Sequence, residues 1–145
     1  RVSHQHVVLE FAARLREYLI RHPVGKVLCS PADISWGPDS LVQPDVFVMV
    51  PDEARTQDWK HVKTLMLVIE VLSPSTSRSD RFTKRRLYQE VGVRTYWVVD
   101  PIARAVEVWT PDATLPVVER ERVVWHPAGA ASALTIELVQ VFPPA

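Results

Sequence analysis

The sequence contains a single cysteine, Cys29, so it cannot form an internal disulfide bond. It has no apolar run near the ~18 residues that a membrane-spanning helix needs. Seventeen basic residues balance seventeen acidic ones, so the overall positive field of many nucleic-acid-binding proteins is missing, although local clusters are still possible. These absences predict a soluble, cytoplasmic protein without membrane association.

Several catalytic signatures are also missing from the sequence. Its cysteine and histidines do not have the spacing of zinc ligands, and none of its four glycines belongs to a phosphate-binding loop. The segment Ser73-Pro74-Ser75-Thr76 lacks the glycines that flank the serine of a nucleophile elbow. Any catalytic residues therefore belong to a different kind of site.

The length of 145 residues suits one well-packed domain and is too short for two, so we predict a single domain over residues 1–145. Because the sequence begins at Arg1 rather than at Met, we expect a further segment upstream.

Apolar spacing predicts a helix over residues 3–22 and a second one that is capped by Ser79 or Asp80 and ends near Glu90, before Gly92. We expect a loop at 51–63. Strands are expected at 26–30, 33–36, 43–50, 64–72, 95–99, 105–109, 117–125 and 134–138. This order predicts an α/β or α+β fold with a mixed central β-sheet flanked by helices.

The predicted strand over residues 64–72 is nearly all apolar and carries one acid, Glu70. Strand alternation places Leu65, Leu67, Ile69 and Val71 on one face, and Met66, Val68 and Leu72 on the face of Glu70. With both faces apolar, the strand is predicted to be central in the sheet. An unpaired buried carboxylate costs several kcal/mol, so Glu70 is expected to have a cation beside it, and a metal ion is the simplest one to supply.

Asp45 opens another apolar strand, and Lys84 lies on the same stripe of the second helix as the apolar residues that face the sheet. Two acids on neighbouring strands and an inward lysine are the smallest set of side chains that metal-assisted phosphodiester cleavage needs. Alternatively, Lys84 only neutralises Glu70 or pairs with Asp80, and Asp45 is only a strand-entry residue. Arg85 and Arg86 are expected to be ordinary solvated charges.

The other polar candidates have simpler explanations. Asp80 fits a helix cap as well as a functional role, and Asp100, directly before Pro101, is most simply a turn residue. His4 and His6 lie at the start of the first helix, where single histidines are usually surface residues.

Several motifs follow one another in the order that resembles the Uma-two family of bacterial endonucleases, from about Ser3 to Trp109. They are His4-Gln5, Pro44-Asp45, Glu70-Val71-Leu72-Ser73-Pro74-Ser75-Thr76, Asp80, Lys84, Tyr88, Gly92-Val93 and Tyr96-Trp97-Val98-Val99-Asp100-Pro101. The family is assigned to the PD-(D/E)XK superfamily, so the resemblance implies a restriction-endonuclease-like core that holds a divalent metal, Mg²⁺ or Mn²⁺.

By this resemblance, Asp45, Glu70 and the backbone carbonyl of Val71 are the metal ligands, and Asp45, Glu70 and Lys84 form the catalytic set. The superfamily's usual lysine stands two residues after the second acid, where this chain has Leu72. The helix lysine Lys84 is the natural replacement. Family members also carry an acid on a strand before the first helix, which this sequence does not include.

Asp80 and Tyr88 are then expected to steady Lys84, and His4 to support the site from the first helix. The predicted function is metal-dependent hydrolysis of phosphodiester bonds in nucleic acid, with DNA as the expected substrate. A non-catalytic nuclease-fold module that binds nucleic acid or a partner protein is the alternative, and a hydrolase of another phosphate ester stays open. For a possible homodimer, Trp59, Trp109 and Trp125 are candidate interface residues.

Overall fold

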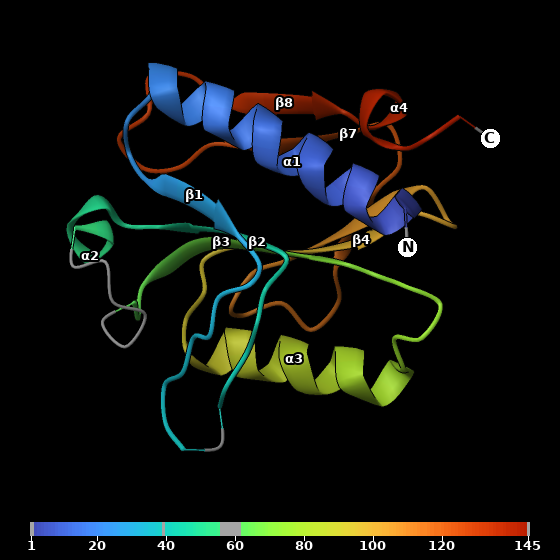
Figure 1. The fold of residues 1–145 in the computed structure, drawn as a ribbon, viewed down its shortest axis with the longest axis horizontal. Coiled ribbons are helices and arrows are strands. Elements are labelled where there is room, and N and C mark those ends of the chain that lie inside the picture. The colour runs from blue at the N-terminus through green and yellow to red at the C-terminus, as the bar shows by residue number, and fades with distance from the viewer. Residues whose placement is uncertain (1, 39, 56–61, 145) are drawn as a thin grey trace.

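The computed structural model describes residues 2–38, 40–55 and 62–144. Its helices and strands follow in a mixed α+β order (Figure 1). They are α1 (Val2–Arg21), β1 (Lys26–Cys29), β2 (Val46–Met49), α2 (Pro51–Ala54), β3 (Leu65–Val71), α3 (Arg78–Glu90), β4 (Tyr96–Asp100), β5 (Ala105–Trp109), β6 (Val117–Glu119), β7 (Arg122–Trp125), β8 (Leu134–Glu137) and α4 (Leu138–Val141).

Six strands form one sheet in the order β1-β2-β3-β4-β5-β6, and β7 pairs with β8 in a separate two-stranded sheet. Only β3 and β4 run parallel; the other neighbours in the six-stranded sheet are antiparallel. A parallel pair needs a crossover, which α3 provides. The mixed sheet and the interior position of β3 confirm the prediction. The carboxyl ends of β3 and β4 therefore lie at the same edge of the sheet.

The six-stranded sheet lies between α1 and α3 (Figure 1), and one apolar core lies on each of its faces. One core lies under α1 and also receives side chains from β7, β8 and α4, with Phe11 and Trp97 in edge-to-face contact. The other lies under α3 and includes Tyr88 and Tyr96, whose ring centroids are 4.8 Å apart. Because each face of β3 is covered by one of these cores, the strand is apolar on both sides.

From Leu67 onward, the side chains of β3 lie on the faces of the sheet that the sequence predicted. Before Leu67 they lie on the opposite faces. Val48 pairs with Leu67 and Met49 with Leu65, so the register shifts by one residue at this bulge. Leu65 consequently lies in the α3 core and Met66 packs against the α1 core, opposite to the alternation expected. Glu70 lies beyond the bulge and keeps its predicted face.

The start of α3 also differs from the prediction. Ser77, rather than Ser79 or Asp80, is the N-cap: its Oγ accepts a hydrogen bond of 3.0 Å from the Asp80 backbone N–H. The predicted end is confirmed, because Gly92 has φ +80°, a conformation in which a side chain is strained.

Three smaller expectations are corrected. The strand expected at 33–36 is reduced to a single bridge between Ile34 and Val42. Within the loop expected at 51–63, residues 51–54 form the short helix α2, and α4 was not expected. None of the helices in the described ranges combines the length and hydropathy that crossing a membrane requires.

Candidate active site

A cavity of about 180 Å³ lies at the carboxyl end of β3, between that strand, the amino-terminal half of α3 and the segment before β2. It contains the three residues on which the sequence prediction depended, Asp45, Glu70 and Lys84. The complete lining is His4, Gln43, Asp45, Glu70, Val71, Leu72, Ser73, Thr76, Asp80, Arg81, Lys84 and Tyr96. Residues far apart in the sequence are thus brought together at one sheet edge.

Glu70 is the buried charged residue of this cavity, with 7% of its surface exposed. Its Oε1 accepts a hydrogen bond of 2.9 Å from the Tyr88 hydroxyl, and its Oε2 lies 3.9 Å from Nζ of Lys84. Burial raises the pKa of Glu70 to about 7, Lys84 opposes that rise, and the negative charge of Asp45 adds to it. Burying the ionised Glu70 carboxylate therefore costs free energy, and Lys84 and Tyr88 offset that cost only in part.

Asp45 is held directly before β2, and β2 runs antiparallel to β3. Its Oδ2 accepts a hydrogen bond of 2.8 Å from the backbone N–H of Val71, the residue after Glu70. The backbone is fixed from the other side, because Ser30 donates its N–H to the Asp45 carbonyl at 3.0 Å. Asp45 is thus more than a strand-entry residue, since its carboxylate is tied to the end of β3.

Lys84 points from α3 toward the sheet, as predicted. Its Nζ lies 3.5 Å from Oδ2 of Asp80 and 3.9 Å from Oε2 of Glu70, and its side chain is 35% exposed. The ammonium group therefore stands at the opening of the cavity, in contact with solvent and with the buried carboxylate. Both simpler interpretations, neutralising Glu70 and pairing with Asp80, are geometrically satisfied as well.

The supporting residues are placed partly as expected. His4 lies 3.5 Å from Oδ2 of Asp45 through its Nε2, so the start of α1 does reach the site. Asp80 contacts Lys84, but the Tyr88 hydroxyl donates to Glu70 instead of holding Lys84. The expected role of Tyr88 is corrected accordingly: it fixes the acid rather than the lysine. The structure places His6 on the exposed surface of α1.

Asp100 is a turn residue, in agreement with the simpler interpretation. Its Oδ1 accepts hydrogen bonds of 3.0 Å from the backbone N–H groups of Ile102 and Ala103. Trp109 and Trp125 are buried, with 8% and 5% of their surface exposed, which removes them as exposed interface candidates. Trp59 lies outside the described residues. The homodimer itself stays a prediction.

The sequence marks Arg81 only as part of a locally cationic stretch of the helix, and the structure places it in the lining of the cavity. It lies three positions before Lys84 on α3, and residues three apart share a helix face, so the spacing contained the signal. Its guanidinium lies 3.2 Å from Oε2 of Glu107 on β5, which draws it toward the far flank of the helix.

The residues of the cavity fit a hard divalent ion such as Mg²⁺ better than a zinc ion. The donors are carboxylate oxygens, from Asp45 and Glu70, and Mg²⁺ is typically bound by one or two carboxylates while it keeps several waters. Among the described residues, no group of three or more His, Cys, Asp and Glu side chains is arranged to hold a metal. A closed zinc site of four protein ligands is therefore disfavoured within that part of the chain.

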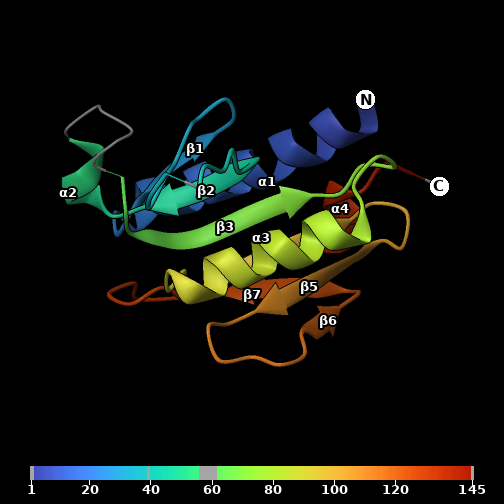
Figure 2. The same ribbon diagram turned by 90° about the horizontal axis from the view of Figure 1, so that it is seen from below.

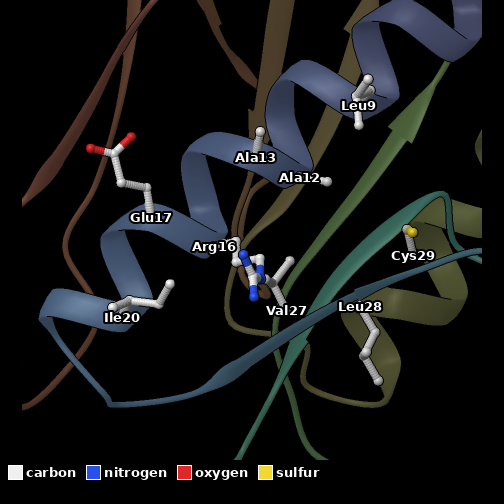
Figure 3. A pocket seen from close by; sticks show the side chains of 9 residues that line it. All are labelled: Leu9, Ala12, Ala13, Arg16, Glu17, Ile20, Val27, Leu28 and Cys29. Carbon is white, nitrogen blue, oxygen red and sulfur yellow. The ribbon is translucent and has the colours of Figure 1, made fainter.

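A larger groove of about 560 Å³ lies away from this site, between α1 and β1 (Figure 3). Its lining is mainly aliphatic, including Leu9, Ile20 and Val27, and Arg16 points from α1 toward β1. It lacks converging acids and bases, so it offers no catalytic chemistry comparable with that of the Glu70 cavity.

Comparison with known proteins shows the family and the fold of the chain. Residues 2–138 match the model of the Uma2 family, which is described as "Putative restriction endonuclease". The chain belongs to the Uma2 family. The match covers all the residues that line the Glu70 cavity and every strand of the six-stranded sheet.

The fold of this Uma2 chain is also found in a solved structure, described as a putative nuclease belonging to DUF820 from Anabaena variabilis. The TM-score is 0.78 at 20% sequence identity, over 97% of this chain and 80% of that chain. This likeness shows a shared nuclease-like fold. No curated protein matches the sequence.

Proposed function

We propose that this Uma2 protein is a metal-dependent endonuclease that hydrolyses phosphodiester bonds of DNA. The observation that carries the proposal is the convergence of Asp45, Glu70 and Lys84 on one cavity at the carboxyl end of β3. Membership of the Uma2 family, described as "Putative restriction endonuclease", supports the reaction class.

In this proposal Asp45 and Glu70, with the carbonyl of Val71, hold Mg²⁺ or Mn²⁺. When bound, such an ion polarises a phosphate and makes water a stronger nucleophile at neutral pH. Val71 N–H fixes one oxygen of Asp45 and the Tyr88 hydroxyl fixes one oxygen of Glu70, so both acids are oriented before a ligand arrives. The protein thereby limits the reorganisation that the reaction requires.

Lys84 supplies the fixed positive charge. Its Nζ stands beside Glu70 at the cavity opening, where a phosphate that approaches the acids would meet it. An ammonium group there stabilises the negative charge that develops on the phosphate oxygens during attack. Asp80, 3.5 Å away, restricts the position of the amine.

The test is cleavage of a supercoiled plasmid with Mg²⁺ or Mn²⁺. The wild-type chain is expected to nick the DNA, and Asp45→Ala, Glu70→Ala and Lys84→Ala are each expected to abolish nicking while the circular dichroism spectrum persists. Asp100→Asn is the matched control, because Asp100 supports a turn by accepting two N–H groups and an amide oxygen can still accept them. Unchanged cleavage in all three site variants contradicts the proposal.

The alternative, a non-catalytic module that binds nucleic acid or a partner protein, is favoured by the zero net charge of the chain. It predicts no metal-dependent nicking by any variant. DNA binding that persists without cleavage under every metal condition would support that alternative.

A further inference from the structure

A second pocket, of about 250 Å³, lies on the other flank of α3, where the helix meets β4 and β5. In Figure 2 the helix crosses this face of the sheet with β5 beside it. The pocket is basic and aromatic: its lining is Arg78, Arg81, Phe82, Arg85, Val98, Glu107 and Trp109. The proposed cleavage chemistry uses none of these side chains.

Arg81 connects this pocket with the active-site cavity, since it lines both. It also lines a third hollow, next to Ser73 and Ile102, at the edge where β3 and β4 end. The three hollows are therefore adjacent around the start of α3. A chain-like ligand whose reacting phosphate lies beside Glu70 can reach the second pocket along the protein surface.

The charge of the second pocket suits a polyanion. Arg81 is paired with Glu107, but Arg78 and Arg85 have no ion-pair partner among residues 2–38, 40–55 and 62–144. Outside the pocket, the neighbouring Arg86 is paired with Glu90. The pocket thus keeps positive charge that its own carboxylate does not neutralise, and such charge binds phosphates.

An exposed aromatic ring stands among these arginines. Phe82 is 51% exposed, although a phenylalanine usually buries most of its surface. The guanidinium of Arg85 lies 4.9 Å from the centre of the Phe82 ring and 4.5 Å from that of Trp109, so Arg85 is not the solvated charge that the sequence predicted. Sites that bind single-stranded nucleic acid typically combine aromatic rings, on which bases stack, with basic side chains that contact the phosphates.

We propose that this pocket binds an unpaired nucleotide of the DNA strand beside the cleaved phosphodiester, with the base stacked on the part of the exposed Phe82 ring that Arg85 does not cover and the phosphate contacted by Arg78 and the N–H groups of Arg85. The inference deepens the nuclease function proposed above and rests on it. In a duplex, each base face is covered by its neighbours, and only base edges are displayed in the grooves. A ring such as Phe82 therefore selects single-stranded or locally unpaired DNA.

The test measures binding rather than cleavage. The affinity of the chain for a fluorescein-labelled oligothymidine of about 12 nucleotides, and for a blunt-ended, GC-rich duplex with the same number of phosphates, is measured by fluorescence anisotropy in EDTA. Phe82→Ala is expected to lower the oligothymidine affinity about tenfold or more and to leave the duplex affinity nearly unchanged. Phe82→Tyr keeps an aromatic ring and is expected to retain the affinity.

Arg78→Ala is expected to weaken binding to both DNAs and to reduce the salt dependence of binding by the contribution of about one phosphate contact. Two matched controls lie on α1: Arg16→Ala removes the same charge, and Ile20→Ala removes a side chain that is 67% exposed. Neither is expected to change the affinity for either DNA. Thermal unfolding verifies that each variant is folded.

An equal loss for both DNAs, or no loss in a folded Phe82→Ala variant, overturns the inference. If Phe82→Ala does not fold, Phe82→Leu removes the stacking ring while it keeps apolar bulk, and the same outcomes apply to it. The two proposals fail separately. Phe82-dependent binding without any cleavage contradicts the nuclease proposal and supports a nucleotide-binding site at Phe82. Metal-dependent cleavage by a chain whose Phe82 variants bind DNA normally supports the nuclease proposal and contradicts the binding site.

Discussion

Glu70 on β3 and Lys84 on α3 face each other across the gap between sheet and helix, with Oε2 and Nζ 3.9 Å apart. The crossover from β3 through α3 to β4 creates this relationship, because it returns the helix over the strand that precedes it. At 3.9 Å the pair lies at the outer limit of a salt bridge, and the carboxylate is buried while the amine is 35% exposed. The lysine therefore only partly compensates the buried charge.

Glu70→Gln is expected to stabilise the metal-free protein at alkaline pH. The pKa of Glu70 is raised from 4.5 to about 7, so between these values the folded state holds a proton that the unfolded state has lost. Stability therefore falls as the pH rises through this window and levels off above about 7. Glu70→Gln is therefore expected to raise the free energy of unfolding by about 3 kcal/mol at pH 8 and to leave it almost unchanged at pH 4. Urea unfolding in EDTA at both pH values measures the difference.

Glu107→Gln provides the comparison, because Glu107 is a half-buried acid outside the cavity, paired with Arg81. It is expected to show no such gain at pH 8. A Glu70→Gln variant that is less stable than the wild type at pH 8 would show that Lys84 and Tyr88 fully compensate the buried charge.

Tyr88→Phe is expected to destabilise the protein more at pH 8 than at pH 5. The variant removes the 2.9 Å hydrogen bond to Oε1 of Glu70 and leaves the buried carboxylate with one donor fewer. Losing a hydrogen bond to a charged group costs about 2 kcal/mol, and protonation of Glu70 at pH 5 reduces that cost. Urea unfolding of the single variants and of the Tyr88→Phe/Glu70→Gln double variant gives the coupling energy. Equal losses at both pH values would mean that the hydroxyl serves the packing of the α3 core alone.

Mn²⁺ is expected to raise the melting temperature of the wild-type chain by several degrees. An ion that binds only the folded state contributes about 2.7 kcal/mol at 100 times its dissociation constant, and about 1 kcal/mol corresponds to roughly 2–4 °C for a domain of this size. Asp45→Asn and Glu70→Gln are expected to abolish the shift, and Asp100→Asn to keep it. A shift that survives both cavity variants would place the ion elsewhere, and no shift in the wild type would favour the binding-only alternative.

The sequence was most informative where local chemistry conflicts with its surroundings. One acid in an apolar strand identified Glu70, and helical spacing placed Lys84 inward, because both patterns depend on the strand and helix periods alone. Periodicity could not anticipate the bulge that exchanges the faces of Leu65 and Met66, since the bulge depends on how β2 pairs with β3. It also could not choose Ser77 over Ser79 as the cap, because both side chains can accept the same kind of bond.

Partners from distant elements were the least predictable part of the site. Tyr88 was expected beside Lys84 because the two lie one turn apart on α3, but its hydroxyl reaches β3 and contacts Glu70. Arg85 was expected in solvent, yet Trp109 of β5 provides an aromatic face for it. In both cases the helix spacing is correct and the packed strand decides the contact.

Lys84→Met separates the catalytic role of the lysine from its structural one. Removing the ammonium group is expected to lower the single-turnover rate of Mn²⁺-dependent DNA cleavage about 100-fold or more at pH 7.5. Part of any loss can arise indirectly, because Lys84 lowers the pKa of Glu70 and its removal leaves more of that acid protonated. That indirect loss disappears above the new pKa of Glu70, so a purely structural lysine predicts that the rate recovers as the pH is raised toward 9. A charge that stabilises the transition state predicts a deficit that persists there, and Lys84→Arg, which keeps the charge, is expected to retain part of the rate. The pH–rate profiles of the wild type and both variants decide between the two roles.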